Sequence, residues 1–374
     1  MNTIKKIGLT ALGTTLVASS AFAGEISVSG DAGYTWSSES GGGASATPVT
    51  GNGSNDGVGY NHDVTFGGSG ELDNGWSVAT SMTITEDSSL SSSNVKLTMG
   101  SMGSVRVGNG TGGIGASYDA VTPVAYEENH DGMSTSTAID NMGALLGNGG
   151  IDYFSPSFDV GGASVSFKYN LTPEASGAAV GEGGVASSSD AYGSGQALGI
   201  DASIAGLSFG VFGAEVQRDS IGVVTRTVTN EKEDSFDGTW YANYTTGPVS
   251  FGYQVGYIAR GINGVSDTAT TGAKYVTTAG GQFESELMSV AFNVNENLSF
   301  SWGELEETYD TTGDANAGRL TGVADSTMES TSIQFAYTMG SMSIKGYQTD
   351  TDNPGWDSDA QSHEVNEIAI NFAF

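Results

Sequence analysis

The sequence predicts an all-β fold: a transmembrane antiparallel β-barrel of about 16 strands, with short periplasmic turns and long extracellular loops. Three observations predict it. Runs in which every second residue is apolar recur along the chain, and period two is typical of strands with two unlike faces. Short and long linkers rich in Gly, Asn, Asp and Ser alternate between these runs. The chain also begins with an export signal and ends on an aromatic strand.

Residues 1–23 have the pattern of a secretory signal. Lys5 and Lys6 precede a short apolar run, and an Ala-x-Ala cleavage site ends at Ala23. The apolar run is too short, and wrongly flanked, for a membrane helix. We therefore expect cleavage after Ala23, which leaves residues 24–374 as one barrel domain.

Composition excludes several function classes. The formal net charge of −31 argues against nucleic-acid binding, which needs clustered bases, and favours attraction of cations. The chain has no Cys, so disulfides, thiolate nucleophiles and Cys-based zinc sites are excluded. The three His are widely separated, which argues against a His metal centre. Mean hydropathy is only −0.15, but this does not exclude a barrel, because every second strand residue faces the lumen.

Seven alternating runs lie in the first half of the chain, on either side of a long interruption. Their ranges are 25–36, 60–68, 76–85, 94–100, 104–108, 151–155 and 163–170. In the last run Val165, Phe167 and Tyr169 fall on one face. Residues 73–75, Asp-Asn-Gly, have the composition of a tight turn between the second and third runs. These features predict consecutive antiparallel hairpins.

Nine further runs follow in the second half. Their ranges are 196–205, 207–218, 236–245, 249–259, 282–294, 298–309, 329–339, 342–350 and 363–374. Phe251, Tyr253 and Val255 align on one face of their run, whereas Phe212 fits the alternation of its run poorly. The total is even, which places both ends of the barrel domain on the periplasmic side.

The last run predicts how the barrel closes. Phe374, Phe372 and Ile370 fall on one face, and Glu367 falls on the other. We expect this strand to pair with the first run, so that no sheet edge remains exposed. Phe372 and Phe374 would then lie in the aromatic girdle at the periplasmic membrane boundary.

Five bases in or beside the predicted strands, half of those outside the signal, lie on the polar face, as expected if the apolar face meets lipid. A Lys or Arg facing lipid at mid-membrane costs about 2–4 kcal/mol. The five inward bases are Lys96, Arg106, Lys168, Arg260 and Lys345. Asp31, Asp201 and Glu367 also point inward and oppose them. The alternative is that these side chains merely occupy the polar face of an amphipathic sheet and have no effect on permeation.

The interruption at residues 109–149 is too long for a hairpin loop and carries acids but no base. Its acids are Asp119, Glu127, Glu128, Asp131 and Asp140. If the segment folds into the barrel, these acids face the bases of the wall across a narrow gap. The alternative is a mobile acidic loop on the surface.

The sequence resembles the general, trimeric porins of Gram-negative bacteria, and the alphaproteobacterial porins most in character. The export signal, the even number of hairpins, the terminal Phe374 and residues 103–121 and 151–169 carry the resemblance. The resemblance implies that residues 109–149 form a constriction loop folded into the pore. It also implies a homotrimer, and recognition of the terminal Phe by the barrel-assembly machinery.

The resemblance also assigns residues to the pore constriction. The five acids of residues 109–149 would form its acidic side, and Lys96, Arg106 and Lys168 its basic side. Acids outnumber bases more than in the family pattern, which weakens the expected transverse field and favours cation preference. Some members of the family bind Ca²⁺ near the constriction. The acid-rich stretch 350–359 is a candidate for Ca²⁺, but Pro354 and the absence of a terminal Glu spoil an EF-hand-like spacing.

No catalytic fingerprint is present. The sequence has no G-x-S-x-G, H-E-x-x-H, P-loop or dinucleotide-binding motif. We therefore expect no enzyme activity and no resident cofactor. The expected function is a water-filled, weakly cation-selective diffusion channel for small hydrophilic solutes in the bacterial outer membrane, embedded in its lipids. The alternatives are a secreted or surface structural β-protein, such as an adhesin, and a barrel enzyme.

Overall fold

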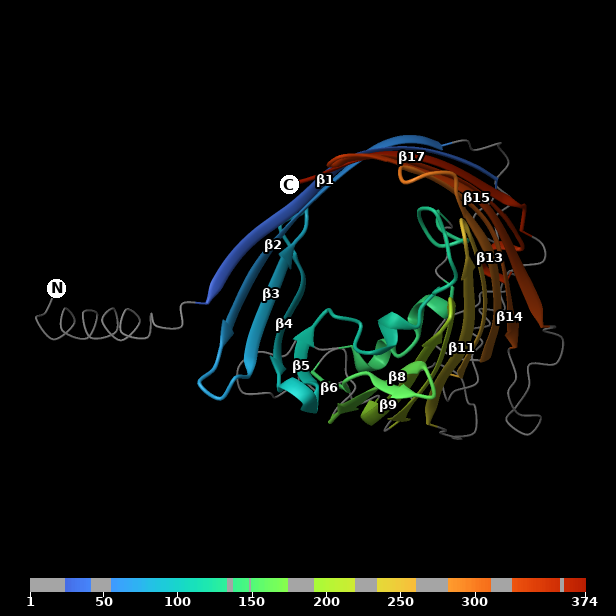
Figure 1. Cartoon of the computed structure of the whole chain (residues 1–374). Helices are drawn as coiled ribbons and strands as arrows, with labels where there is room; N and C mark the ends of the chain where they lie inside the picture. Colours follow the sequence, from blue (N-terminus) through green and yellow to red (C-terminus); the bar gives the residue numbers. More distant parts are fainter. Residues whose placement is uncertain are drawn as a thin grey trace, which may run out of the picture.

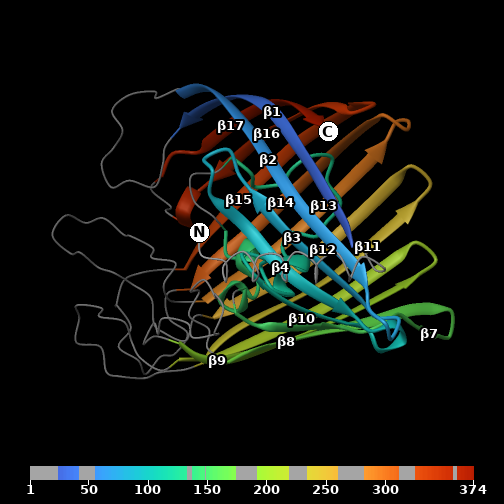
Figure 2. The same ribbon diagram turned by 90° about the vertical axis from the view of Figure 1, so that its left-hand side faces the viewer.

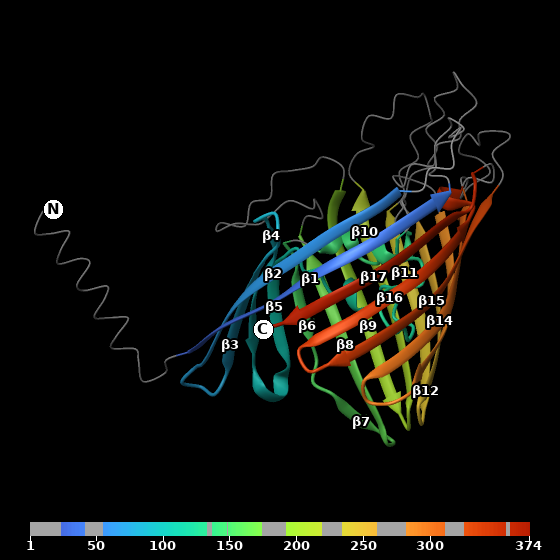
Figure 3. The same cartoon turned by 90° about the horizontal axis from the view of Figure 1, so that it is seen from above.

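The computed structural model describes residues 24–41, 55–132, 137–147, 149–173, 192–218, 234–259, 282–310, 325–356 and 360–374. Within them one antiparallel sheet of seventeen labelled strands closes on itself. Figure 1 shows the strands arranged around a ring, with the segment between β5 and β6 inside it. Figures 2 and 3 show that the strands run obliquely around the barrel, as closure requires. A closed barrel rules out the solenoid expected of the structural-protein alternative.

The strands of the first half are β1 Glu25–Gly41, β2 Asn55–Glu71, β3 Ser77–Ile84, β4 Leu90–Thr98, β5 Ser104–Asn109, β6 Ile151–Phe154, β7 Phe158–Val160 and β8 Ala163–Thr172. Both β6 and β7 pair with β8, on either side of residues 155–157, Ser-Pro-Ser. They therefore share one position in the barrel, because the Pro lacks the N–H that a continuous ladder needs. The barrel has sixteen strand positions, as predicted.

The strands of the second half are β9 Tyr192–Ile204, β10 Leu207–Arg218, β11 Ser235–Thr246, β12 Val249–Ala259, β13 Gln282–Asn293, β14 Leu298–Asp310, β15 Ser326–Met339, β16 Met342–Asp352 and β17 His363–Ala373. Turns of two to four residues join β9 to β10, β11 to β12, β13 to β14 and β15 to β16 at one end of the barrel. Gly206, Gly247 and Gly340 adopt positive φ in three of these turns, which other residues rarely tolerate. The predicted division into short turns and long connections is confirmed.

The first two strands are longer than predicted. Pairing of β1 with β2 continues through Ser37 opposite Gly57 to Glu39 opposite Asn55. These residues are polar or small on both faces, so the period-two signal ends before the hydrogen-bonded ladder does. Backbone pairing does not depend on an apolar face.

The closing strand lies where the sequence places it. β17 pairs with β1, with Trp36 opposite Ile368. Two backbone hydrogen bonds of 2.9 Å between Gly30 and Phe374 complete the closure. Phe372 and Phe374 lie on the outer face and are exposed, as are apolar side chains around the whole barrel. None of the helices in the described ranges is long and apolar enough to cross a membrane. Residues 1–23 lie outside the described ranges, so the signal stays a prediction.

Candidate functional site: the segment inside the barrel

The connection between β5 and β6 lies inside the barrel in its described residues, 110–132, 137–147 and 149–150, and we call these the inner segment (Figure 1). These described residues contain three 3-10 turns, η3 Gly115–Ser117, η4 Ile139–Asn141 and η5 Ala144–Leu146. Ile139 and Tyr118 are fully buried. The prediction of an inward-folded segment is confirmed, and the alternative of an acidic surface loop is wrong.

Two glutamines of the wall hold the backbone of the inner segment. Gln254 on β12 donates to Tyr118 O at 2.7 Å and accepts from Val121 N at 2.8 Å. Gln334 on β15 donates to Glu127 O at 2.7 Å and accepts from Tyr126 N at 2.9 Å. A primary amide can do both because it carries a donor and an acceptor. The inner segment thereby satisfies backbone groups that have no strand partner.

Two buried carboxylates of the wall accept hydrogen bonds from the far part of the inner segment. Glu307 on β14 accepts from Ala138 N at 2.9 Å and from Ile139 N at 3.2 Å, where η4 begins. Asp237 on β11 accepts from Gly143 N at 3.0 Å. Hydrogen bonds between a carboxylate and backbone N–H groups are stronger than neutral ones. The wall therefore fixes this part of the inner segment by charge as well as by shape.

An apolar core inside the barrel completes the attachment. Its buried members are Ile114, Tyr118, Ala138, Ile139, Met142, Leu146, Ala197, Phe212, Ala214, Val216, Ile258, Phe283, Leu287, Leu305, Tyr309, Met328 and Trp356. The rings of Tyr118 and Phe212 stack with centroids 5.0 Å apart. Phe212 fits its strand's alternation poorly because it points inward onto the inner segment. Gly303 on β14 leaves room for Asn129, since a Cβ there would lie 2.1 Å from the Asn amide.

The predicted acids of the inner segment occupy two different settings. Asp140 forms an ion pair with His130, at 2.8 Å between Oδ2 and Nε2. Among the described residues Asp119, Glu127 and Glu128 form no ion pair with a base, and Oδ1 of Asp119 is buried without a hydrogen-bond partner. Asp131 is half-buried. The structure therefore brings four of the five predicted acids together without pairing them with bases.

Burial and mutual repulsion shift the protonation of these groups. Burial, with the charges of Asp140 and Glu128, raises the pKa of Asp119 to about 8. Burial and the charge of Asp131 raise the pKa of Glu127 to about 7, against the opposing charge of Lys345. Burial would lower the pKa of His130, but its hydrogen bond to Asp140 and the carboxylate's charge prevail and raise it. The charge of the inner segment therefore changes near neutral pH.

Two of the predicted wall bases are ion-paired. Arg106 Nε and Nη2 donate to Asp152 Oδ2 at 2.9 and 2.7 Å, and Nη2 also donates to Gly113 O at 2.8 Å. Lys168 Nζ lies 3.1 Å from Asp201 Oδ2, and Asp201 also accepts from Tyr118 OH at 2.9 Å. These bases therefore fasten the inner segment to β5, β6, β8 and β9.

Lys96 and Lys345 form no ion pair within the described part of the chain. Lys96 Nζ lies 5.2 Å from the ring centroid of Phe154, and Lys345 Nζ lies 5.0 Å from that of Tyr126. Arg260 lies outside the described residues. Lys345 therefore lies beside Tyr126 of the inner segment, just before the acids Glu127 and Glu128. Lys96, on β4, lies beside Phe154 on β6.

The opposite wall carries acids that the sequence analysis did not single out as a pair. Asp31 on β1 and Asp63 on β2 are directly opposite in the ladder, and both point inward. The alternation of apolar residues at Val64 and Phe66 places Asp63 on the inward face, and this pattern could have identified it from the sequence. Both sides of the lumen are therefore acidic, which weakens the predicted transverse field.

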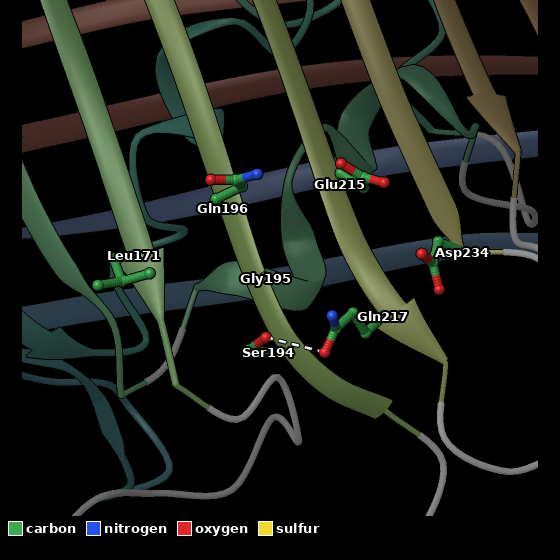
Figure 4. A pocket seen from close by; sticks show the side chains of 7 residues that line it. All are labelled: Leu171, Ser194, Gly195, Gln196, Glu215, Gln217 and Asp234. Carbon is green, nitrogen blue, oxygen red and sulfur yellow. Dashed lines mark hydrogen bonds between the residues drawn. The ribbon is translucent and has the colours of Figure 1, made fainter.

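A small hollow lies apart from these residues, at the ends of β8 to β11 (Figure 4). Its volume is about 200 Å³, and it is lined by Leu171, Ser194, Gly195, Gln196, Glu215, Gln217 and Asp234. Ser194 donates to Gln217 Oε1 at 3.0 Å. No residue predicted to act in the site lines it. Within the described ranges no grouping of three or more acidic or His side chains is arranged to hold a metal ion.

Comparison with solved structures shows the same fold. An anion-selective porin from Comamonas acidovorans is similar over 94% of this chain and 100% of its own, with a TM-score of 0.60 and 15% identity. OmpF from Salmonella typhi, in complex with daunomycin, is similar over 94% of this chain and 98% of its own, with a TM-score of 0.62 and 13% identity. A porin refined at 1.8 Å covers 94% of this chain and 100% of its own, with a TM-score of 0.54 and 18% identity. Neither a family model nor a curated protein sequence matches the chain.

Proposed function

We propose that the chain is an outer-membrane porin: a water-filled channel through which small hydrophilic solutes and ions diffuse passively. The observation that carries the proposal is a closed barrel of sixteen positions whose lumen is narrowed on one side by a fixed inner segment. A barrel of this size is wide enough for an aqueous channel. An exposed apolar outer face fits contact with lipid. No covalent step is involved.

We further propose a weak preference for cations. The supporting observation is the charge balance of the lumen, where Asp119, Glu127 and Glu128 on the inner segment face Asp31 and Asp63 on the wall. Arg106 and Lys168 are compensated by ion pairs, so they contribute little net field. The similar Comamonas porin is anion-selective. The fold itself thus does not imply cation preference, and the proposal depends on the acidic residues that line this lumen.

The resemblance stated above supplies the remaining proposals. The chain would be of the alphaproteobacterial type, form a homotrimer, and depend on Phe374 for recognition by the barrel-assembly machinery. The absence of a resident cofactor, with residues 350–359 as a solvated loop and not a Ca²⁺ site, also stays a prediction.

The proposal is tested by single-channel recording in planar bilayers under a KCl gradient. We expect stable conductance and a reversal potential of the sign that K⁺ preference produces. A reversal potential of the opposite sign would contradict the charge argument. If a correctly folded barrel shows no conductance, the proposal that the protein is a channel is wrong.

A further inference from the structure

The outer face of β14 to β17 and β1 changes polarity in successive cross-strand rows. Each row consists of residues directly opposite one another on neighbouring strands. The first row is Phe300, Phe335, Gly346, Ile368 and Trp36. The next row towards the long-loop end is Trp302, Ile333, Gln348, Asn366 and Ser38. The third row is Glu304, Thr331, Asp350, Glu364 and Ser40. Within two rows the surface passes from apolar through amide to carboxylate.

A hollow, which we call the groove, lies beside Gly346 in the apolar row. The ring of Phe335 covers this buried glycine and occupies the space that a Cβ would take, and Ile368 lies opposite the glycine on the next strand. The groove has a volume of about 420 Å³, and Trp36 and Ile333 also contribute to its walls. This volume falls within the roughly 300–1,000 Å³ typical of small-molecule sites. Because the groove opens on the outer, apolar face, its natural occupant is hydrocarbon.

A carboxylate held by two amides stands at the polar end of the groove. Glu364 Oε1 accepts from Gln348 Nε2 at 3.2 Å and from Asn366 Nδ2 at 3.0 Å. Both amide residues line the groove. Asp350 lies directly opposite Glu364 on β16. Two acids therefore adjoin the groove, at the level where the outer surface becomes polar.

No described base compensates these acids from outside. Lys96, Arg106, Lys168 and Lys345, the Lys and Arg whose side chains the structure describes, all lie on the lumen face of their strands. The phosphate of an anionic lipid would be repelled here, whereas an ammonium group would be attracted. Among lipids whose acyl chain fits the groove, the charge of these acids therefore favours those with an ammonium headgroup.

We propose that this groove binds a membrane lipid whose headgroup carries a free ammonium group, with one acyl chain against Ile333, Phe335 and Ile368 and the ammonium at Asp350 and Glu364. The inference rests on the proposed location in a membrane. The apolar part of the site is continuous with the face that contacts the bilayer, so a lipid reaches it without leaving the membrane. The acids decide the headgroup.

Native mass spectrometry of the full-length protein in nanodiscs tests the proposal. The probes are phosphatidylethanolamine and phosphatidylglycerol with identical acyl chains, mixed equally. We expect retention of phosphatidylethanolamine to exceed that of phosphatidylglycerol by about threefold, the effect of a partly exposed charge pair. Equal retention of the two lipids, or preference for phosphatidylglycerol, would overturn the assignment.

Two variants test separately how the groove binds the acyl chain and how the acids select the headgroup. Ile368→Trp fills the groove, and we expect at least about a tenfold loss of retained lipid, since each CH₂ excluded costs roughly 0.8 kcal/mol. Ile370→Trp, on the same strand and face but outside the groove, is the control and should retain lipid. The double change Asp350→Asn and Glu364→Gln should abolish the headgroup preference while total retention persists. Persistence of the preference in that variant would contradict the assignment.

Two further readouts distinguish other outcomes. If Ile368→Trp alters the oligomer mass, the groove is a contact between copies of the chain and the lipid assignment is wrong. Conductance in planar bilayers, measured on the same samples, reports the proposed channel independently. A barrel that conducts but binds both lipids equally would refute only the lipid site, and a barrel that binds but does not conduct would refute only the channel.

Discussion

The two halves of the lumen wall are built differently. On β11 to β15, inward side chains such as Ser285, Leu287 and Gln334 are almost fully buried beneath the inner segment or beside it. On β1 and β2, inward side chains such as Asn61 and Asp63 keep contact with solvent. One half therefore resembles the interior of a soluble protein, and the other remains a wetted wall. The comparison teaches that the lumen is narrowed from one side only. In the proposed channel, water and solute would therefore pass along the half that the inner segment leaves uncovered.

The largest effect is expected from removing Glu307, a wall residue that holds the inner segment on the half of the lumen that this segment covers. Glu307→Ala deletes the carboxylate that accepts from Ala138 N and Ile139 N, and a buried N–H left without an acceptor costs about 1–3 kcal/mol. We expect a larger single-channel conductance and a lower thermal stability. The matched change Glu39→Ala, on the uncovered half, should alter stability little. Unchanged conductance in Glu307→Ala would mean that the inner segment does not set the pore size.

A charge test follows with a smaller expected effect. Replacing Asp119, Glu127 and Glu128 by their amides should shift the reversal potential in a KCl gradient towards anions, because the covered side of the lumen loses its negative charge. The control replaces Glu284, Glu286 and Glu304, three acids of the outer face, by Gln. The control removes the same charge from outside the lumen. If both triple variants behave alike, lumen charge does not determine selectivity.

The pH dependence sharpens the same comparison. The pKa values of about 8 for Asp119 and about 7 for Glu127 mean that both deprotonate as the pH rises from 6 to 9. Cation preference should therefore increase over this range and fall again on acidification. Recording the reversal potential at each pH checks this, and the amide variant of both residues should show a flatter profile. A profile that is equally steep in the variant would place the titrating groups elsewhere.

The smallest expected effect compares two bases. Lys345→Met removes a base that forms no ion pair within the described residues, whereas Lys168→Met removes one that is paired with Asp201. Both changes remove one positive charge from the lumen, so both should shift the reversal potential towards cations. Only the second should also lower stability clearly, because it leaves Asp201 without its cation. Reversal potentials and thermal melting of both variants, measured together, decide the point. Equal thermal stability of the two variants would show that the ion pair of Lys168 does not help to fasten the inner segment.

Much of the fold follows from period two and from turn composition. The sixteen positions, the closing pair of β1 with β17, and the orientation of Lys96 and Arg106 can all be read from alternation. The ion pair of Arg106 with Asp152 cannot, because the two residues lie on neighbouring strands whose register only pairing reveals. The roles of Gln254, Gln334 and Glu307 also escape the sequence. Polar residues on a lumen face look alike whether they contact water or another segment.

The sequence by itself determined that this chain is an amphipathic barrel, because each strand must present one face to an apolar surrounding and one to a polar lumen. It also determined that the chain is strongly acidic. Only the tertiary structure decided where that charge acts. Folding of the inner segment onto β9 to β16 neutralises Asp140, buries Asp119 and leaves Asp31 and Asp63 on the uncovered wall. Those distinctions depend on distances between residues far apart in the chain, which no local pattern encodes.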